Sequence, residues 1–147
     1  MTFTPIKSFA ATSLLLLAAM LFAPYGVHAE QGELYSPERG NPIRTEILNI
    51  IRTDVEQWVN HEVLFFNVDI RVLDDWAWAT VEPRSTDGMN SYEFVTALLH
   101  KQSEAWTVAE YPGCEGGEEE CFDADLFFKG VTARNPGVPQ ALFPEDW

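Results

Sequence analysis

Basic residues and cysteines are both scarce in this sequence. Lys and Arg number 9 against 23 Asp and Glu, which gives a formal net charge of −14. Such a charge repels nucleic-acid phosphates and anionic lipid surfaces, and no basic cluster in the sequence offsets it. We therefore expect no nucleic-acid partner. The chain has 2 cysteines, and no Cys and His spacing is typical of a zinc site.

Motifs for nucleophilic catalysis are also missing. No Gly-x-Ser-x-Gly elbow surrounds a serine, and after residue 29 the histidines are His61 and His100 alone. A hydrolase triad needs a nucleophile, a histidine and an orienting carboxylate in one place, which this pattern does not indicate. We expect no catalytic residue and no cofactor.

No hydrophobic run is long enough for a comfortable membrane span, which needs about 20 apolar residues. The apolar run from Phe9 to Phe22 is shorter, Lys7 precedes it, and Val27-His28-Ala29 fits a small-residue cleavage site. We predict a signal peptide over residues 1–29. The product is then exported to the periplasm or the extracellular space, without a membrane anchor after cleavage.

Cys114 and Cys121 bracket a short acidic loop. Export places them where disulfides persist, so we predict a disulfide that closes this loop and stabilises the fold by about 2.5 kcal/mol. The same region is a weak calcium candidate, because calcium prefers oxygen ligands, although the spacing is not that of an EF-hand and a solvated acidic run is the alternative. The calcium candidates are Glu118, Glu119, Glu120, Asp123 and Asp125.

Residues 64–81 are typical of two strands joined at an acidic turn. Apolar residues alternate from Leu64 to Val72, which predicts a strand with one buried face, and Asp74-Asp75 favours a turn. Trp76 and Trp78 then share one face of the second strand. The turn formers after Val81 include Pro83, which we expect to end this strand.

Periodicity assigns most of the remaining chain. Asn41-Pro42 indicates the start of an amphipathic helix of about five turns, and alternation predicts further strands over residues 91–101 and 106–111. Short connections make the sheet antiparallel. The expected fold is α+β: one N-terminal amphipathic helix packed on a four-stranded antiparallel meander, with a short C-terminal helix or turn.

The predicted organisation is a single domain. We expect a flexible lead-in over residues 30–40, the α+β domain over residues 41–134 and an extended C-terminal tail over residues 135–147. Both faces of the predicted sheet carry large apolar residues, so something must cover the face that the helix leaves free. The candidates are the segment 122–128, a second copy of the chain, or a ligand.

Hydrophobic and turn positions carry a resemblance that covers most of the chain after the signal peptide. They are Phe66-x-Val68-x-x-x-Val72-x-x-Asp75-Trp76-Ala77-Trp78, Pro83, Gly88, Leu98-Leu99, Trp106-x-Val108 and Leu142-Phe143. With these positions and one helix before a meander, the chain resembles small exported bacterial proteins of unassigned function with a cystatin-like or NTF2-like fold. The loop between the cysteines departs from that pattern.

The resemblance implies a fold and directs attention to two places. Cystatin-type inhibitors carry Gln-x-Val-x-Gly at a hairpin tip, and the corresponding turn here, residues 73–76, lacks that motif. NTF2-like enzymes place acids, histidine or tyrosine inside a conical pocket. This makes Asp69, Tyr92 and His100 candidate pocket residues, with solvated surface or edge positions as the alternative.

The hairpin itself is the other candidate. Exposed aromatic residues dominate binding surfaces, so Trp76 and Trp78, with Asp74 and Asp75, form a candidate binding surface; core packing is the alternative for the tryptophans. We expect an exported, non-enzymatic module that binds another exported protein or itself as a homodimer, or that belongs to the envelope. The alternative is an NTF2-like small-molecule binder or small enzyme with a pocket between helix and sheet.

Overall fold

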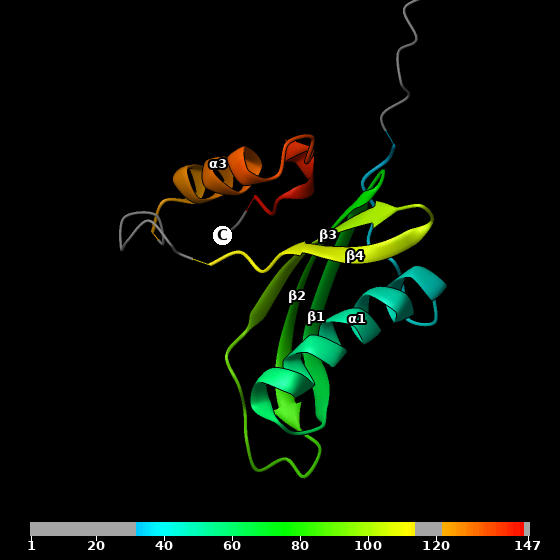
Figure 1. Cartoon of the computed structure of the whole chain (residues 1–147), viewed down its shortest axis with the longest axis vertical. Helices are drawn as coiled ribbons and strands as arrows, with labels where there is room; N and C mark the ends of the chain where they lie inside the picture. Colours follow the sequence, from blue (N-terminus) through cyan, green and yellow to red (C-terminus); the bar gives the residue numbers. More distant parts are fainter. Residues whose placement is uncertain (1–31, 114–121, 146–147) are drawn as a thin grey trace, which may run out of the picture. The chain divides into compact units, whose positions relative to one another are not determined.

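The computed structural model describes residues 32–113 and 122–145. The residues outside these ranges include 1–29, Cys114, Cys121 and Glu118 to Glu120. The signal peptide, the disulfide and most of the calcium cluster therefore stay predictions. The elements are α1 (Pro42–Val59), β1 (Val63–Leu73), β2 (Trp76–Ser85), β3 (Val95–Gln102), β4 (Ala105–Glu110), α3 (Ala124–Arg134) and a 3-10 turn η1 (Gln140–Leu142) (Figure 1). The α+β class with a four-stranded antiparallel sheet and two helices is confirmed. Within the described ranges, neither helix has the length and apolar character that a membrane crossing needs.

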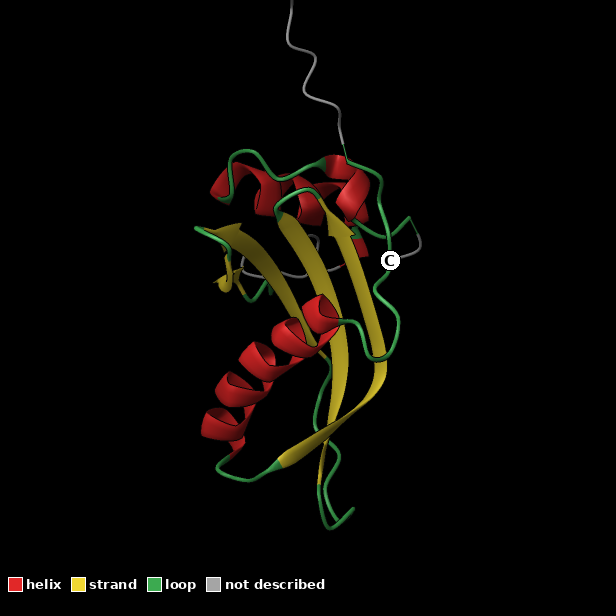
Figure 2. Ribbon diagram, turned by 90° about the vertical axis from the view of Figure 1, so that its right-hand side faces the viewer, coloured by secondary structure: helices red, strands yellow, loops and turns green. Residues whose placement is uncertain are grey.

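The sheet is a meander with the strand order β1-β2-β3-β4. Its first turn lies at Asp74 and Asp75, as predicted, and Leu73 pairs with Trp76 across it. The third connection, between β3 and β4, has both Ser103 and Glu104 at positive φ, 50° and 69°, which is the backbone of a tight hairpin turn. Figure 2 shows α1 running obliquely across the strands and α3 lying across their upper ends.

Helix α1 packs on one face of the sheet. Asn41 caps it, accepting the Ile43 N–H on its side-chain oxygen at 2.9 Å, and Pro42 occupies the first turn. The helix buries Ile47, Ile51 and Val55, which are spaced four apart and so lie on one face. The core beneath also contains Val63, Ile70, Val72, Ala77, Ala79, Val81, Ala97, Leu99 and Trp106. These side chains fill the space between α1 and the sheet.

The C-terminal segment covers the upper part of the opposite face. Phe127 and Val131 of α3, together with Val138, Leu142 and Phe143, form a second buried cluster with the sheet residues Leu73, Trp78 and Leu98. The prediction of an extended surface tail over residues 135–147 was therefore wrong for the described part. Leu142 is fully buried, and the Arg71 Nη1 donates to the Phe143 carbonyl at 2.7 Å, which ties the segment to β1.

The lead-in also differs from its prediction. Tyr35 and Val72 exchange both backbone hydrogen bonds, at 3.0 and 2.8 Å, and Pro37 is buried. The middle of the expected flexible stretch 30–40 thus adds one bridge to the outer edge of β1. Hydrogen bonding to a strand edge, rather than hydrophobic periodicity, fixes this segment, so composition gave no sign of it.

A β-bulge in β1 overturns part of the predicted alternation. The register shifts between Phe66 and Asp69, and Asn67 adopts a left-handed φ of 45°. The residues that face α1 are consequently Val63, Phe65, Val68, Ile70 and Val72. Leu64 and Phe66, expected on the buried face, are 49% and 44% exposed on the other one.

Two strand boundaries also move. Pro83 does not end β2, which continues to Ser85. The Pro83 carbonyl accepts the Tyr92 N–H at 3.0 Å, so the missing N–H of the proline faces away from β1 and costs no bond of the β1–β2 ladder. The third strand begins at Val95 instead of residue 91, and Ser91 forms only an isolated bridge with Arg84.

Candidate functional site

The predicted pocket residues do not come together. Asp69 is exposed and pairs with Thr80 on the sheet face opposite α1. Tyr92 packs against the core beneath α1, on the other side of the sheet. His100 lies at the far end of β3, stacked on Trp76 at 4.0 Å between ring centroids and hydrogen-bonded to the Gln102 amide at 3.1 Å. No common pocket follows from these positions.

The predicted binding surface at the hairpin is also divided. Trp78 is 1% exposed and belongs to the cluster that α3 covers, with its ring edge-on to Phe128 and Phe143. It is a core residue. Trp76 is half-buried against the same cluster, while Asp74 and Asp75 are exposed at the tip. The two tryptophans therefore do not form one exposed aromatic surface.

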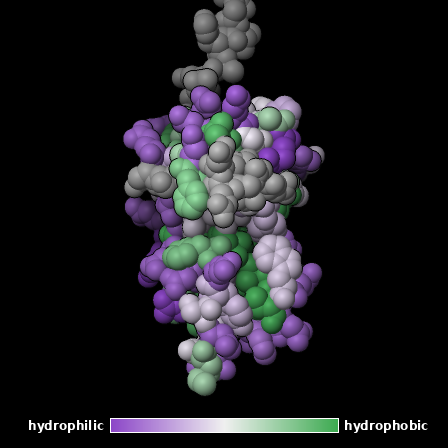
Figure 3. Space-filling view, turned by 90° about the vertical axis from the view of Figure 1, so that its left-hand side faces the viewer, coloured by the Kyte–Doolittle hydropathy of each residue, from purple (hydrophilic) through white to green (hydrophobic). Residues whose placement is uncertain are grey.

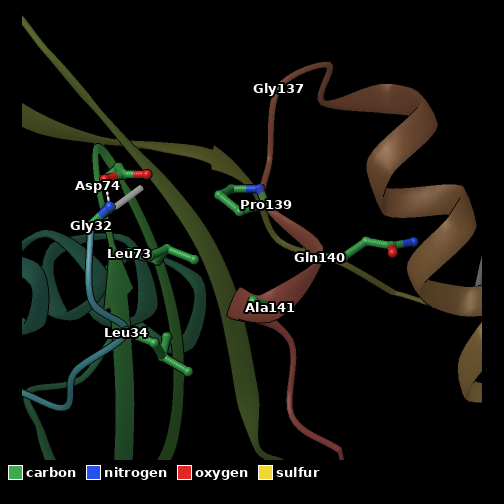
Figure 4. A pocket seen from close by; sticks show the side chains of 8 residues that line it. All are labelled: Gly32, Leu34, Leu73, Asp74, Gly137, Pro139, Gln140 and Ala141. Atoms are coloured by element: carbon green, nitrogen blue, oxygen red, sulfur yellow. Dashed lines mark hydrogen bonds between the residues drawn. The ribbon is translucent and has the colours of Figure 1, made fainter. Parts of the chain in front are cut away.

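Asp74 lines a cleft of about 540 Å³ between the hairpin tip, the lead-in and the C-terminal segment. Figure 4 shows Gly32 and Asp74 side by side, facing Pro139 and Ala141, with the Gln140 side chain pointing away from them. The Asp74 carboxylate accepts the Gly32 N–H at 2.7 Å. A side chain at Gly32 would meet that carboxylate, since a Cβ there would lie 2.3 Å from its Oδ1. The one acidic group of this cleft thus serves the fold.

The two calcium candidates that the structure describes, Asp123 and Asp125, lie at the start of α3. Asp123 caps the helix by accepting the Leu126 N–H at 3.1 Å, and Asp125 lies in the first turn, where its charge suits the helix dipole. Within residues 32–113 and 122–145, no group of three His, Cys, Asp or Glu side chains could hold a metal ion.

A second cleft, also of about 540 Å³, lies between α1 and the outer edge of β1. We call it the arginine cleft. Its lining consists of Arg39, Arg44, Leu48, Arg52, Phe65, Phe66, Asn67 and Val68. Arg39 is exposed, whereas Arg44 and Arg52 are half-buried. Three of the 9 basic residues of this acidic chain therefore line one cavity of a volume typical of ligand sites.

The arginines of the cleft keep most of their hydrogen-bonding capacity. Arg44 donates one bond, to the Pro37 carbonyl at 3.2 Å, and Arg52 donates one to the Asn49 side chain at 2.9 Å. The Arg52 guanidinium also lies 5.2 Å from the Phe65 ring centroid, a cation–π distance. A guanidinium has five N–H donors, so several remain for a ligand.

None of the three arginines forms an ion pair with any residue that the structure describes. The ion pairs in this part of the chain join Arg84 to Glu82, Lys101 to Glu104 and Arg134 to Glu110. Guanidinium groups recognise carboxylates and phosphates through charge-assisted, often bidentate hydrogen bonds. The arginine cleft is therefore suited to an anionic group.

The bulge at Asn67 shapes one wall of the cleft and is held from the other side of the sheet. The Asn67 amide donates to the Glu82 Oε2 at 2.6 Å, and Arg84 donates to the Glu82 Oε1 at 2.8 and 2.6 Å. The hydrogen bonds from Arg84 are the main reason why the pKa of Glu82 lies below its usual value, and those from Asn67 and Ser91 act in the same direction. Glu82 thus positions the bulge as an ionised carboxylate.

Hydrophobic surface adjoins the cleft on the face of the sheet opposite α1. Leu64, Phe66 and Phe94 are exposed, and the Arg84 guanidinium lies 4.6 Å from the Phe66 ring centroid. Figure 3 shows hydrophobic surface in the lower half of the side that carries α3. The C-terminal segment thus covers only part of this face.

Sequence reasoning missed the arginine cleft, because the arginines are not clustered in sequence. One signal was available: Arg44, Leu48 and Arg52 are spaced four apart, so they form a stripe along α1 beside its buried face. The bulge that completes the cleft gave no comparable signal.

Comparison of the chain with known protein families, curated proteins and solved structures gives no match.

Proposed function

We propose that this chain is an exported, non-enzymatic binding module whose arginine cleft takes a carboxylate-bearing partner. The observation that carries the proposal is the gathering of Arg39, Arg44 and Arg52, without an ion pair in the described residues, in one cleft of a chain of net charge −14. Five of the eight basic residues that the structure describes form no ion pair with another described residue, and three of these five line this one cleft. Their gathering leaves a site for an external anion.

We also propose a cystatin-like or NTF2-like fold, which the order of one long helix followed by a meander supports. The NTF2-like alternative function would require an open pocket between α1 and the sheet. Ile47, Ile51 and Leu99, all fully buried, fill that space, so we favour binding over catalysis. Export rests on the apolar leader, which makes another exported protein the expected partner.

Titration with glutarate, a small dicarboxylate, tests the proposal. The purified full chain, labelled with ¹⁵N, is titrated with glutarate and with the neutral diamide of the same length at matched ionic strength. We expect glutarate, and not the diamide, to shift the amide signals of Arg44, Arg52 and Asn67. Equal shifts with both compounds, or shifts spread over the whole surface, would show that the cleft does not select a carboxylate.

Single substitutions locate the binding. Arg44→Gln and Arg52→Gln each remove charge-assisted donors, and we expect each to weaken glutarate binding about five- to tenfold. Lys129→Gln on α3 is the matched control, because it changes the net charge equally and lies outside the cleft lining. If the control weakens binding as much as the cleft variants do, overall charge and not the cleft controls affinity.

A further inference from the structure

The outer edge of β1 presents free backbone groups at the arginine cleft. The Val63 N–H donates to the Glu56 carboxylate at 3.1 Å and the Ser85 N–H donates to the Asn90 carbonyl at 3.0 Å. The paired residues Val63 and Ser85 therefore exchange no hydrogen bonds with each other. Orientation repeats every two residues along a strand, so Phe65, opposite Pro83, also directs its N–H and C=O away from β2.

One residue of the lead-in already pairs with this edge in the way that an added strand would. Tyr35 pairs with Val72 in antiparallel fashion through two backbone hydrogen bonds. The lead-in then leaves the edge for α1, whose cap is Asn41. From Val63 to Val68, no segment among the described residues pairs with the outer edge of β1.

The bulge lies in the part of the edge that lines the arginine cleft. Asn67 and Val68 together stand opposite the one residue, Val81, between the paired positions Glu82 and Thr80. The extra residue leaves backbone groups of β1 without a ladder partner and bends the strand. Phe65, Asn67 and Val68 all line the arginine cleft, so open backbone and open guanidinium groups share one cavity.

We propose that the occupant is an extended acidic segment of a partner protein, which adds as a strand to β1 along Phe65–Val68. This proposal rests on the proposed function and names the class of partner. Charge complementarity selects the acidic side chains, because Arg39, Arg44 and Arg52 lie on the α1 side of the edge. Main-chain hydrogen bonds supply the rest of the affinity, as in other cases of strand addition.

The two faces of the sheet predict a sequence pattern for this segment. Side chains of an added strand alternate between the faces. Those on the α1 side meet the arginines, whereas those on the other side meet the exposed Leu64 and Phe66. The preferred segment therefore alternates acidic and apolar residues.

Four blocked hexapeptides test the pattern against the purified full chain, by calorimetry and ¹⁵N NMR. The first alternates Glu and Val, and the second alternates Gln and Val. The third and fourth are the Glu–Val peptide with N-methyl groups on every Glu or on every Val. We expect the Gln peptide to bind at least about tenfold more weakly, because charge-assisted bonds are lost. Only alternate N–H groups of a paired strand face its neighbour. One of the two methylated peptides should therefore lose about as much affinity as the Gln peptide does, and the other should keep its affinity.

The bound Glu–Val peptide should also slow hydrogen exchange at the Phe65 amide. Equal binding of the two methylated peptides would overturn strand addition, and equal binding of the Gln peptide would overturn the choice of an acidic segment. Binding of glutarate without binding of the Glu–Val peptide would overturn it too, while leaving the proposed function intact. Failure of both ligands would remove the proposed function itself. A dimer that protects the Phe65 amide without peptide would replace the acidic partner by a second copy of the chain.

Discussion

Truncation of Leu142 tests whether the C-terminal segment is part of the core. Leu142 has no exposed surface and packs with Trp78, Leu98 and Phe127. Leu→Ala removes three carbon groups, worth about 2.4 kcal/mol at about 0.8 kcal/mol each, and a residual cavity adds to this. We expect Leu142→Ala to lower the free energy of unfolding by about 3 kcal/mol. With a urea m-value of about 1.5 kcal/mol/M, the unfolding midpoint falls by about 2 M.

Leu126→Ala is the matched control, because Leu126 lies on α3 and is 46% exposed. The same atoms are removed, but about half of the transfer term is absent and no closed cavity forms, so we expect a loss of about 1 kcal/mol or less. Equilibrium urea unfolding, followed by tryptophan fluorescence, measures both variants. Equal losses within about 0.5 kcal/mol would show that residues 135–145 do not pack on the sheet as the structure has them.

Substitutions at three further positions test the contacts that support the cleft and α1. The pKa of Glu82 is held below its usual value of 4.5, mainly by the hydrogen bonds from Arg84. Its ionisation therefore stabilises the fold above about pH 4.5, and this contribution to the free energy of unfolding is lost as the pH falls further. Glu82→Gln should make the urea midpoint decline less steeply below about pH 4.5, and an unchanged slope would refute the assignment. Asn67→Ala should destabilise more than Asn67→Gly, because glycine tolerates the φ of 45°, and the reverse order of midpoints would contradict a left-handed bulge residue. The Tyr111 hydroxyl donates to the Asp54 Oδ2 at 2.6 Å, so Tyr111→Phe should cost about 1 kcal/mol in urea unfolding. Burial and the hydrogen bond to Asp54 raise the pKa of Tyr111, so its phenol stays protonated at pH 11 in the native protein. The absorbance change from phenol ionisation at this pH should therefore be the same in the native chain and in the native Tyr111→Phe variant.

Local sequence signals were sufficient for the hairpin and insufficient for the face of β1. Asp74-Asp75 stands between two apolar runs, and the turn lies there. In Val63-Leu64-Phe65-Phe66, however, either register puts apolar side chains in the core, so alternation could not choose between them. The choice depends on Asn67, whose amide bonds to Glu82, 15 residues away. Such a contact exists only once β1 and β2 have paired.

The sequence also predicted only part of what packs on the sheet face opposite α1. The apolar residues on both sides of the strands indicated that something must pack there, and segment 122–128 was one of three candidates. The position of Leu142 depended on a turn that three prolines and a glycine obscured, because residues 135–145 contain no hydrophobic period. The arginine cleft was missed for a related reason, because its lining combines residues of α1 with residues of the β1 edge. Two of these lining residues, Arg52 and Phe65, are 13 residues apart in the sequence.

The net charge and the arginine cleft act over different distances, and together they narrow the class of ligand. Repulsion by a net charge of −14 extends over about 10 Å at 0.1 M salt, whereas the arginines act through hydrogen bonds at contact distance. Duplex DNA carries a charge about every 1.7 Å, so most of its phosphates would face the acidic surface without reaching the cleft. A segment with a carboxylate at every second residue spaces its charges about 6.6 Å apart and places apolar groups between them. If the proposed function holds, such a sparse anion would gain the contacts of Arg44 and Arg52 with less repulsion from the rest of the molecule than a duplex would meet.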